Sequence, residues 1–322
     1  MRTNTIYHIN SLIGLDLLPS NSINSCVTSP PYYGLRNYDA EGQIGLEPTP
    51  EEFIGELVEV FEGVRRVLRP DGTAWIVIGD SYAGSGRGWT FTGFTKQTKY
   101  QGFSGMKPFT SDIYKAKDLI GIPFMLAFAL RAKGWYLRQI LIWSKPNGKP
   151  ESVTDRCTGS HEYILLLSKS KKYYFDYRAI EQIAKTQENR PIAIVRERKL
   201  QYKSKRNVNP EAHLQKINYL GGGNCIVKQS NDDGTNTARK RSVWTVATQP
   251  YKGAHFATYP PELIRDCIRA GCPPGGVVLD PFGGSGTTAE VAIEEGREYI
   301  LFEINKNSVD LANERILKTL LK

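Results

Sequence analysis

The segment from residue 277 to residue 295 constrains the fold of this chain more than any other. A short β-branched and apolar run, Val277 to Leu279, ends in Asp280 and continues into a glycine-rich turn, Pro281 to Gly286. The residues from Ala289 to Glu295 then have a helical pattern. Glycines in such a turn let the backbone approach a ligand closely at the N-terminus of the helix. The order of strand, glycine turn and helix therefore predicts a nucleotide-type ligand site in an α/β domain.

A second predicted strand, Tyr299 to Phe302, ends in Glu303, which lies 23 residues after Asp280. An acid about 20 residues after the glycine turn, at the tip of the next strand, can bind ribose hydroxyls. The glycines of the turn do not form the G-x-G-x-x-G pattern of dinucleotide sites, and the Lys-Ser/Thr ending of a phosphate-binding loop is missing. A ligand with a ribose and an amino-acid tail, such as S-adenosylmethionine (AdoMet), therefore fits this pattern better than a phosphate-bearing ligand.

The N-terminal part contains a rigid aromatic loop, Ser29-Pro30-Pro31-Tyr32, after the apolar run Ile23 to Val27. Two consecutive prolines lack N–H donors and have a fixed φ, so they form a loop rather than part of a sheet ladder. The loop presents carbonyl oxygens, a serine hydroxyl and an aromatic face, which suit an exocyclic amino group on a flat ring. Taken alone, the segment is equally well interpreted as a proline-rich turn after a strand.

Together, the two segments resemble those of the amino-methylating DNA methyltransferases. The catalytic motif precedes the AdoMet motif, as in the β class of that family, and Ser-Pro-Pro-Tyr is similar to the N4-cytosine branch. N6-adenine enzymes usually have Asp or Asn in place of Ser29. The resemblance covers about residues 1–180 and 243–322. Other stretches that share it are Leu68 to Thr73, Trp143 to Asn147, Ser160 to Ile164 and His255 to Pro260.

This resemblance implies a reaction and a set of catalytic residues. Ser29 Oγ and the Pro30 carbonyl would accept the N–H groups of a cytosine amino group, which otherwise is a poor nucleophile, and Tyr32 would stack on the base. Methylation of a base inside a duplex requires that the base is flipped out, and in-line transfer requires the reacting atoms at about 3–3.5 Å. A C5-cytosine mechanism would need a Pro-Cys nucleophile, which the sequence lacks. The expected catalytic residues are Ser29, Pro30, Pro31 and Tyr32.

The cofactor site implied by the resemblance combines residues from both ends of the chain. Where family members usually have Gly-Asp, this chain has Ile9-Asn10-Ser11, so Asn10 or the backbone would contact the adenine. Glu303 would bind the ribose. The expected AdoMet-binding residues are Asn10, His255, Phe256, Thr258, Asp280, Phe282, Gly284, Ser285, Gly286 and Glu303.

The rest of the chain alternates predicted helices and strands, which indicates a mostly parallel sheet with helices on both faces. The expected fold is therefore an α/β, Rossmann-like AdoMet-dependent methyltransferase fold with permuted motif order. Expected helices span residues 51–68 and 119–133, and expected strands span residues 74–78, 136–143, 163–167 and 172–175. A glycine-rich stretch, residues 83–112, is predicted to be a mobile element over the site.

A basic stretch separates the two halves. Residues 185–245 contain 13 Lys or Arg and 5 Asp or Glu, which is +8 of the chain's net charge of +9. We predict a catalytic half (1–184), a target-recognition region (185–242) inserted into the fold, and an AdoMet-binding half (243–322). Phosphate contacts supply most non-specific DNA affinity. The expected DNA-binding residues are Arg196, Arg198, Lys199, Lys203, Lys205, Arg206, Arg239, Lys240 and Arg241.

The five cysteines are scattered without a C-x-x-C pair, and the four histidines do not cluster. We therefore expect no metal site, and a reduced, cytoplasmic protein of a prokaryote or phage with no membrane segment. The expected partners are double-stranded DNA and a cognate restriction endonuclease, and the expected state is a monomer or homodimer.

The leading hypothesis is an AdoMet-dependent DNA methyltransferase that forms N4-methylcytosine. The first alternative is N6-adenine methylation by the same fold. A non-catalytic DNA-binding module is less favoured because Ser29, Tyr32, Asp280 and Glu303 are all present. A nicotinamide oxidoreductase is disfavoured by the glycine spacing.

Overall fold

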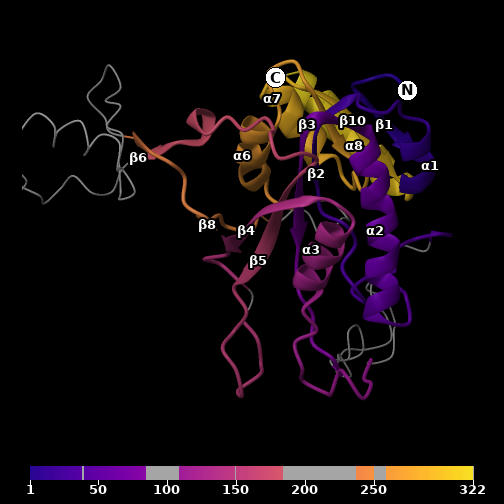
Figure 1. Ribbon diagram of the computed structural model, residues 1–322, viewed down its shortest axis with the longest axis vertical. Coiled ribbons are helices and arrows are strands. Elements are labelled where there is room, and N and C mark those ends of the chain that lie inside the picture. Colours follow the sequence, from indigo (N-terminus) through magenta and orange to yellow (C-terminus); the bar gives the residue numbers. More distant parts are fainter. Residues whose placement is uncertain (38–39, 85–108, 149, 184–236, 250–258, 322) are drawn as a thin grey trace, which may run out of the picture. The chain divides into compact units, whose positions relative to one another are not determined.

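The computed structural model describes residues 1–37, 40–84, 109–148, 150–183, 237–249 and 259–321 (Figure 1). The chain forms two compact units, one of residues 1–179 and 241–322 and one of residues 180–240. In the described part of the second unit, β6 (Gln182–Ile183) pairs antiparallel with β7 (Thr237–Ala238). A short 3-10 helix, η1 (Arg178–Ile180), lies at the boundary between the units. The fold and the candidate site described below belong to the first unit.

The first unit contains an eight-stranded sheet with the order β1-β10-β9-β2-β3-β5-β4-β8. Every neighbouring pair is parallel except the two pairs of β5, which is antiparallel to β3 and β4. The predicted mostly parallel sheet is thereby confirmed. Its strands are β1 (Thr5–His8), β2 (Ile23–Thr28), β3 (Leu68–Ile78), β4 (Tyr136–Ser144), β5 (His161–Ser168), β8 (Val243–Thr245), β9 (Val277–Asp280) and β10 (Glu298–Glu303).

The two informative sequence segments lie next to each other although they are far apart in the chain. Strand β2 pairs with β9, with Ser25 opposite Val278 and Cys26 opposite Leu279. Because the strands are parallel, the loops that follow them leave the same edge of the sheet. The Ser29 loop and the glycine turn are therefore neighbours, as methyl transfer between the two motifs requires.

Three helices pack on one face of the sheet: α1 (Ser11–Asp16), α2 (Pro50–Val67) and α3 (Ile122–Ala132) (Figure 1). Helix α2 begins where the Thr49 side chain accepts from Glu52 N, with Pro50 in the first turn. Its apolar residues recur at helical spacing and are buried, so the face toward the sheet is hydrophobic. Helix α3 begins where Asp80 Oδ1 accepts from the backbone N of Gly121 and of Ile122, at 2.9 and 3.0 Å. These contacts fix the end of β3 against the start of α3.

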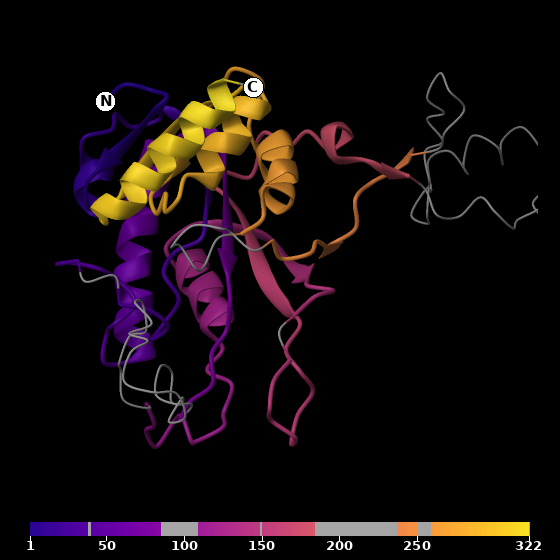
Figure 2. The same cartoon turned by 180° about the vertical axis from the view of Figure 1, so that it is seen from behind.

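The other face is covered by α6 (Pro261–Gly271), α7 (Thr287–Glu294) and α8 (Lys306–Leu320) (Figure 2). Helix α6 approaches β3 closely: a Cβ at Gly271 would lie 2.4 Å from Trp75 Nε1. Trp75 is almost fully buried on this face, whereas its neighbours Ala74 and Ile76 belong to the core under α2. Helices on both faces are thus confirmed.

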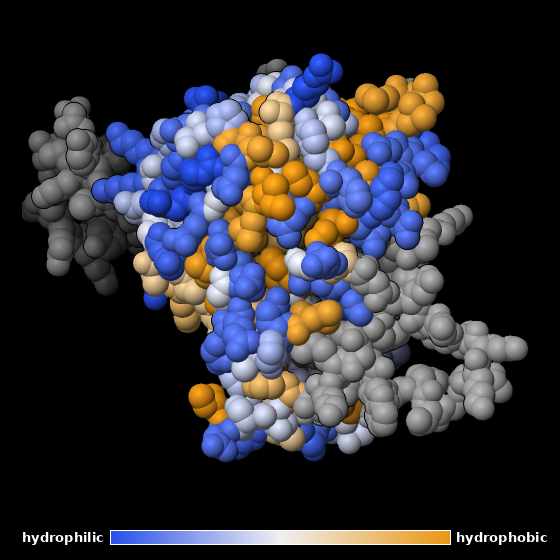
Figure 3. All heavy atoms as spheres, turned by 90° about the vertical axis from the view of Figure 1, so that its right-hand side faces the viewer, coloured by the Kyte–Doolittle hydropathy of each residue, from blue (hydrophilic) through white to orange (hydrophobic). Residues whose placement is uncertain are grey.

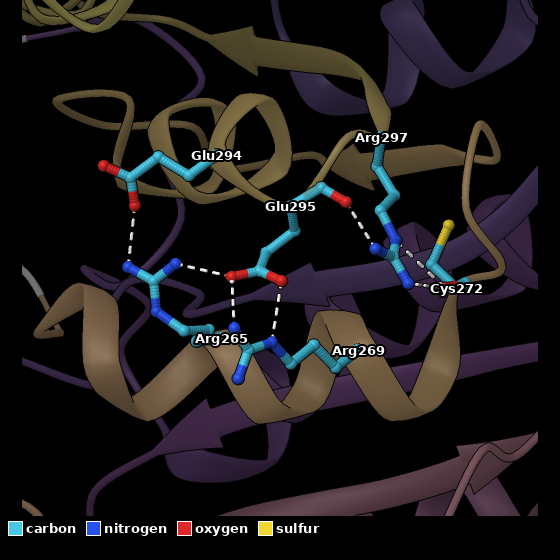
Figure 4. Close-up of polar contacts among 6 residues, drawn as sticks. All are labelled: Arg265, Arg269, Cys272, Glu294, Glu295 and Arg297. Atoms are coloured by element: carbon cyan, nitrogen blue, oxygen red, sulfur yellow. Dashed lines mark hydrogen bonds and ion pairs between the residues drawn. The ribbon is translucent and has the colours of Figure 1, made fainter. Parts of the chain in front are cut away.

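A group of ion pairs fastens α6 to the end of α7 (Figure 4). Glu295 accepts from Arg265 at 2.6 Å and from Arg269 at 2.7 and 2.9 Å, and its side chain is only 10% exposed. Arg265 also pairs with Glu294, and Arg297 donates to the Cys272 carbonyl. Burial opposes ionisation of Glu295, but the hydrogen bonds from Arg269 and Arg265 outweigh it and lower the pKa of the carboxyl.

Replacement of Glu295 by glutamine is expected to lower the free energy of unfolding at pH 7 by about 1–3 kcal/mol, because two arginines lose a charged acceptor. The lowered pKa means that this contribution is fully present above the ordinary glutamate pKa and is lost as the pH falls from there through the lowered pKa of the folded protein. Urea unfolding at pH 7 and at about pH 3 measures both effects. The control is Glu314→Gln, whose exposed pair with Lys318 is worth about 0–0.5 kcal/mol. Equal losses in the two variants would contradict the role given to Glu295.

One predicted strand is wrong. Residues 172–175 form no strand, because the segment leaves the sheet edge and crosses the Trp75 side of the sheet. Tyr174 N donates to the Asp71 carbonyl, and the Phe175 ring stacks on Trp75 with centroids 6.1 Å apart. Side-chain packing therefore takes the place of ladder hydrogen bonds.

The outer surface carries both hydrophobic and hydrophilic side chains. On the side drawn in Figure 3, hydrophobic side chains lie in several groups among hydrophilic ones. Exposed apolar residues of the flanking helices include Ile13 of α1, Leu17 directly after α1, and Leu317 and Leu320 of α8. Apolar atoms form more than half of an ordinary protein surface, so these side chains need no partner to explain them. Within the described residues, no helix has the length and apolar character required to cross a bilayer.

Candidate active site

An open hollow lies where β1, β2, β9 and β10 end at one edge of the sheet. Its cavity volume is about 90 Å³, and it is open to solvent. Loops after all four strands contribute to its wall, so both sequence motifs face the same space. The residues that line it are Asn10, Ser11, Ser29, Pro31, Gly42, Gln43, Ile44, Pro281, Phe282, Gly284, Glu303 and Ile304.

Glu303 ends β10 and binds the backbone of the glycine turn. Its Oε2 accepts from Gly284 N and its Oε1 accepts from Asn305 N, both at 2.8 Å. Gly284 has a φ of 49°, a left-handed conformation that glycine adopts without strain. Burial raises the pKa of Glu303, and these backbone hydrogen bonds oppose the rise. An ionised carboxylate has about four acceptor positions, and three backbone groups, of Gly284, Ile304 and Asn305, bind this one, so it retains capacity for a ligand hydroxyl at the wall of the hollow.

Asp280 joins the two motifs from beneath the hollow. Its carboxylate is fully buried and accepts from four donors. Oδ1 accepts from Thr28 Oγ1 at 2.6 Å and from Phe282 N at 3.0 Å. Oδ2 accepts from Thr288 Oγ1 at 2.5 Å and from the Tyr259 hydroxyl at 3.0 Å. Because Thr28 directly precedes Ser29, Asp280 positions the Ser29 loop relative to the glycine turn.

The glycine turn is also supported from behind. Arg315 of α8 donates to the Ser285 carbonyl and hydroxyl, each at 3.3 Å, and pairs with Glu290 at 3.3 Å. Gly286 has a φ of 80°, and a Cβ there would lie 2.9 Å from the Ala312 side chain. This close approach of α8 explains why glycine and small side chains occupy the turn.

The Ser-Pro-Pro-Tyr loop has one accessible polar end and one anchored end. Ser29 is half-buried at the hollow, whereas Pro30 is buried. The Tyr32 hydroxyl donates to Glu162 Oε2 at 2.6 Å. Pro31 packs against the segment that follows, since a Cβ at Gly45 would lie 3.3 Å from Pro31 Cβ.

Part of the wall of the hollow was not predicted from the sequence. Gly42, Gln43 and Ile44 line the hollow opposite the glycine turn, and Asn10 Nδ2 donates to the Gly42 carbonyl at 3.3 Å. Ser11, also missed, donates to the Pro281 carbonyl at 2.5 Å. The available signal was the pair of glycines at 42 and 45 just after the proline loop; both have positive φ, which marks turns that a ligand or loop can approach.

The predicted catalytic and cofactor residues fall into three groups, apart from Pro30 and Tyr32, which are not among the residues that line the hollow. Ser29, Pro31, Asn10, Phe282, Gly284 and Glu303 line the hollow. Asp280, Ser285 and Gly286 lie behind it and support the turn, as described above. His255, Phe256 and Thr258 lie outside the described residues, as do most residues of the predicted mobile element.

The predicted DNA-binding residues are described only at the C-terminal end of the basic stretch. Arg239 and Lys240 belong to the second unit and Arg241 to the first. The Arg241 carbonyl accepts from Trp244 Nε1 at 2.8 Å. Outside the described residues are Arg196, Arg198, Lys199, Lys203, Lys205 and Arg206.

Three of the four cysteines that the structure describes are buried: Cys26, Cys267 and Cys272. Burial raises the pKa of the Cys26 thiol well above its usual value, and raises the pKa of Cys272 to about 12. Cys157 is exposed. Among the described residues, no group of three or more metal-ligating side chains occurs.

We expect iodoacetamide at pH 8 to alkylate Cys157 at least about tenfold faster than Cys26, Cys267 or Cys272, because the thiolate is the reactive form and buried thiols are scarcely ionised. Peptide mass spectrometry after short labelling measures the rates, and labelling in urea is the control that makes all thiols reactive. Fast labelling of Cys26 in the folded protein would contradict its burial in the core.

Comparison with known proteins agrees with the geometry. The profile of the N6/N4 methyltransferase family, described as DNA methylase, matches residues 23–314. This chain belongs to the DNA methylase family. The methylase is 40% identical over 316 residues to the type II methyltransferase M.XycI of Xanthomonas campestris pv. cyanopsidis, covering 98% of this chain and 88% of that protein. It is 42% identical over 302 residues to M.SmaI of Serratia marcescens, covering 94% and 86% of the two chains.

Solved structures share the fold of the methylase. PvuII DNA methyltransferase (cytosine-N4-specific) has a TM-score of 0.61 at 18% identity, covering 98% of this chain and 86% of that chain. A DNA modification methylase of Thermus thermophilus, complexed with S-adenosyl-L-methionine, has a TM-score of 0.55 at 22% identity, covering 98% and 95%. The predicted methyltransferase fold and the resemblance to amino-methylating DNA methyltransferases are confirmed. The methylase is accordingly a DNA methyltransferase.

Proposed function

We propose that this methylase transfers a methyl group from AdoMet to the N4 amino group of a flipped cytosine in duplex DNA. The observation that carries the proposal is the single hollow into which both Ser29 and Glu303 face. In this proposal, the amino group of the base is held at Ser29 and the ribose of the cofactor at Glu303, two residues that line the same hollow.

The cofactor end fits AdoMet. Glu303 has unused acceptor positions for ribose hydroxyls, Phe282 offers an aromatic wall, and Asn10 lies on the same side at the end of β1. AdoMet supplies an activated methyl group on a positively charged sulfonium. A buried carboxylate near a cationic ligand is favoured electrostatically, and that interaction would offset the burial that raises the pKa of Glu303.

The catalytic end fits an amino group. Ser29 Oγ and the Pro30 carbonyl are acceptors for the two N–H bonds of the cytosine amino group, so that its nitrogen lone pair turns out of the ring plane toward the methyl donor. Ser29 in the first place of the motif favours cytosine over adenine, because the N6-adenine enzymes that this chain resembles usually have Asp or Asn there. Pro31 would limit movement of the base, and the Tyr32 ring would stack on it.

Replacement of Glu303 by alanine is expected to weaken AdoMet binding by about 10- to 150-fold, because the ribose hydroxyls lose their hydrogen bonds to a charged acceptor. The rate at saturating AdoMet should fall by less than tenfold, because Ser29 is unchanged. Isothermal titration calorimetry measures the dissociation constant. Glu298→Ala, at the opposite end of β10, is the matched control. Unchanged AdoMet affinity in Glu303→Ala would contradict the placement of the ribose.

The relatives named type II methyltransferases support a place in a restriction–modification system. We therefore propose double-stranded DNA and a cognate restriction endonuclease as partners, and the cytoplasm of a prokaryote or of a phage-infected cell as the location. The division into a catalytic half, a basic target-recognition region and an AdoMet-binding half, and a monomeric or homodimeric state, remain predictions.

The proposal is tested by incubating the protein and methyl-labelled AdoMet with bacterial genomic DNA, RNA or protein, and then digesting the labelled product to nucleosides. We expect label in DNA, in N4-methylcytosine. Label in N6-methyladenine would overturn the assigned base but keep the reaction class. Label confined to RNA or protein would overturn the proposed substrate.

A further inference from the structure

A series of contacts leads from Tyr32, in the loop after β2, to residues of β5 and β4. The Tyr32 hydroxyl donates to Glu162 Oε2 at 2.6 Å, and Lys145 Nζ donates to Glu162 Oε1. Lys145 Nζ also lies 4.3 Å from the centre of the Trp143 ring. The Trp143 ring is buried and its Nε1 donates to the Val246 carbonyl at 2.8 Å. Each residue in this series is thus held by a contact with the next one.

The sheet topology explains why these residues meet. Strand β5 is antiparallel to its neighbours, so it starts at the edge where the parallel strands end. Glu162, near its start, and Lys145, just after β4, therefore reach the same edge as the catalytic loop. In the strand order, β3 lies between β2 and β5, and Tyr32 must cross the end of β3 to reach Glu162.

The crossing is possible because β3 is followed by a glycine. A Cβ at Gly79 would lie 2.8 Å from Tyr32 Cε2 and 3.3 Å from Cδ2, closer than real side chains allow. One edge of the Tyr32 ring therefore rests directly on backbone, and its hydroxyl is bound to Glu162. The ring has two constraints, one from packing and one from a hydrogen bond, before any base arrives.

We propose that Glu162 and Lys145 are positioning residues that lock the Tyr32 ring in the orientation that stacks on the flipped target base. This inference rests on the proposed function and adds to it a role for Glu162 and Lys145. Glu162 acts through the Tyr32 hydroxyl, and Lys145 acts by fixing the Glu162 carboxylate. A ring that is ordered beforehand avoids losing side-chain freedom when the base binds.

The burial of the pair suits this role. The side chains of Glu162 and Lys145 are 17% and 18% exposed. Interactions between charges are screened less at such positions than at the surface, so the carboxylate stays in one place. An exposed pair such as Lys117 and Asp155, with 82% and 52% exposure, has no comparable effect on geometry.

The test is a double-mutant cycle between Tyr32→Phe and Glu162→Ala, with single-turnover methyl transfer to DNA as the readout. The phenylalanine keeps the ring and removes only the hydroxyl. We expect each single variant to lower the transfer rate by about tenfold, and the double variant to lose no more than either one, because both remove the same interaction. AdoMet affinity should stay within twofold of wild type. Glu162→Gln keeps an acceptor for the hydroxyl and should recover most of the rate.

Two further variants keep the test decisive if Glu162→Ala unfolds, since it leaves Lys145 unpaired. Lys145→Met should lower the rate in the wild-type background but not in the Tyr32→Phe background. Glu295→Gln, which weakens an ion-pair group elsewhere (Figure 4), controls for general destabilisation and should lower thermal stability without lowering the transfer rate at 25 °C.

Additive losses in the cycle, or a full rate for Tyr32→Phe, would overturn the positioning role while leaving the proposed reaction intact. Failure of the proposed function has a different signature, because the wild-type protein itself would then transfer no methyl group to DNA.

Discussion

Replacement of Ser29 by alanine is expected to lower the rate of methyl transfer by about 10²–10³-fold, the usual effect of deleting one well-placed polar group that stabilises a transition state. The lost group is the hydroxyl that, in the proposed reaction, accepts an N–H group of the target base. AdoMet affinity should change less than twofold, because Glu303 and the glycine turn keep their contacts. Single-turnover kinetics and calorimetry on the same preparation measure the two quantities separately.

Ser22→Ala is the matched control for this variant. Ser22 lies just before β2, at its opposite end, and its hydroxyl donates to the Pro19 carbonyl, so the same chemical change is made away from the hollow. We expect its transfer rate to equal that of wild type. A Ser29→Ala protein with a normal rate, or with AdoMet binding lost in proportion to rate, would contradict the division of the hollow into two ends.

Replacement of Asp280 by alanine is expected to lower the free energy of unfolding by about 2–4 kcal/mol, because several buried donors lose their acceptor. The transfer rate of the fraction that remains folded should fall by about 10²-fold, since a displacement near 1 Å at a catalytic group has an effect of this size. The displaced group is Ser29, whose neighbour Thr28 donates to Asp280 at 2.6 Å. Urea unfolding and single-turnover kinetics test the two parts.

Asp280→Asn distinguishes the hydrogen bonds from the charge. The amide keeps one acceptor, and the hydroxyls of Tyr259 and Thr288 can rotate to accept from its NH2 group. It should therefore lose less stability than the alanine variant. An alanine variant that unfolds like wild type and keeps its rate would contradict the inference that Asp280 couples the two loops.

The sequence predicted those parts of the fold that depend on local pattern. The helix at 50–67 and the strands at both motifs follow from apolar spacing, a proline at the helix start and glycines in the turn. The proximity of the Ser29 loop and the glycine turn followed from the resemblance, because in-line methyl transfer requires the acceptor and the donor to meet. These rules connect residue type to backbone geometry, and one chain is enough to apply them.

The contacts that the sequence did not reveal depend on strand order. Asp280 was interpreted as a cofactor residue, but a carboxylate after a strand can face either a ligand or the core, and only the pairing of β9 with β2 brings Thr28 to it. The link from Tyr32 to Glu162 likewise requires that β5 runs antiparallel. The predicted strand at 172–175 was wrong because its aromatic residues pack over Trp75 instead of pairing with a strand.

In the proposed function, the protein methylates the amino group of cytosine in the hollow that Ser29 and Glu303 line. This function has a direct test. It is tested most directly by mass spectrometry of nucleosides from the DNA of cells that express the protein, compared with cells that express Ser29→Ala. We expect N4-methyldeoxycytidine in the first DNA and its near-complete loss in the second. N6-methyldeoxyadenosine in place of N4-methyldeoxycytidine, or equal N4-methyldeoxycytidine in both DNAs, would contradict it.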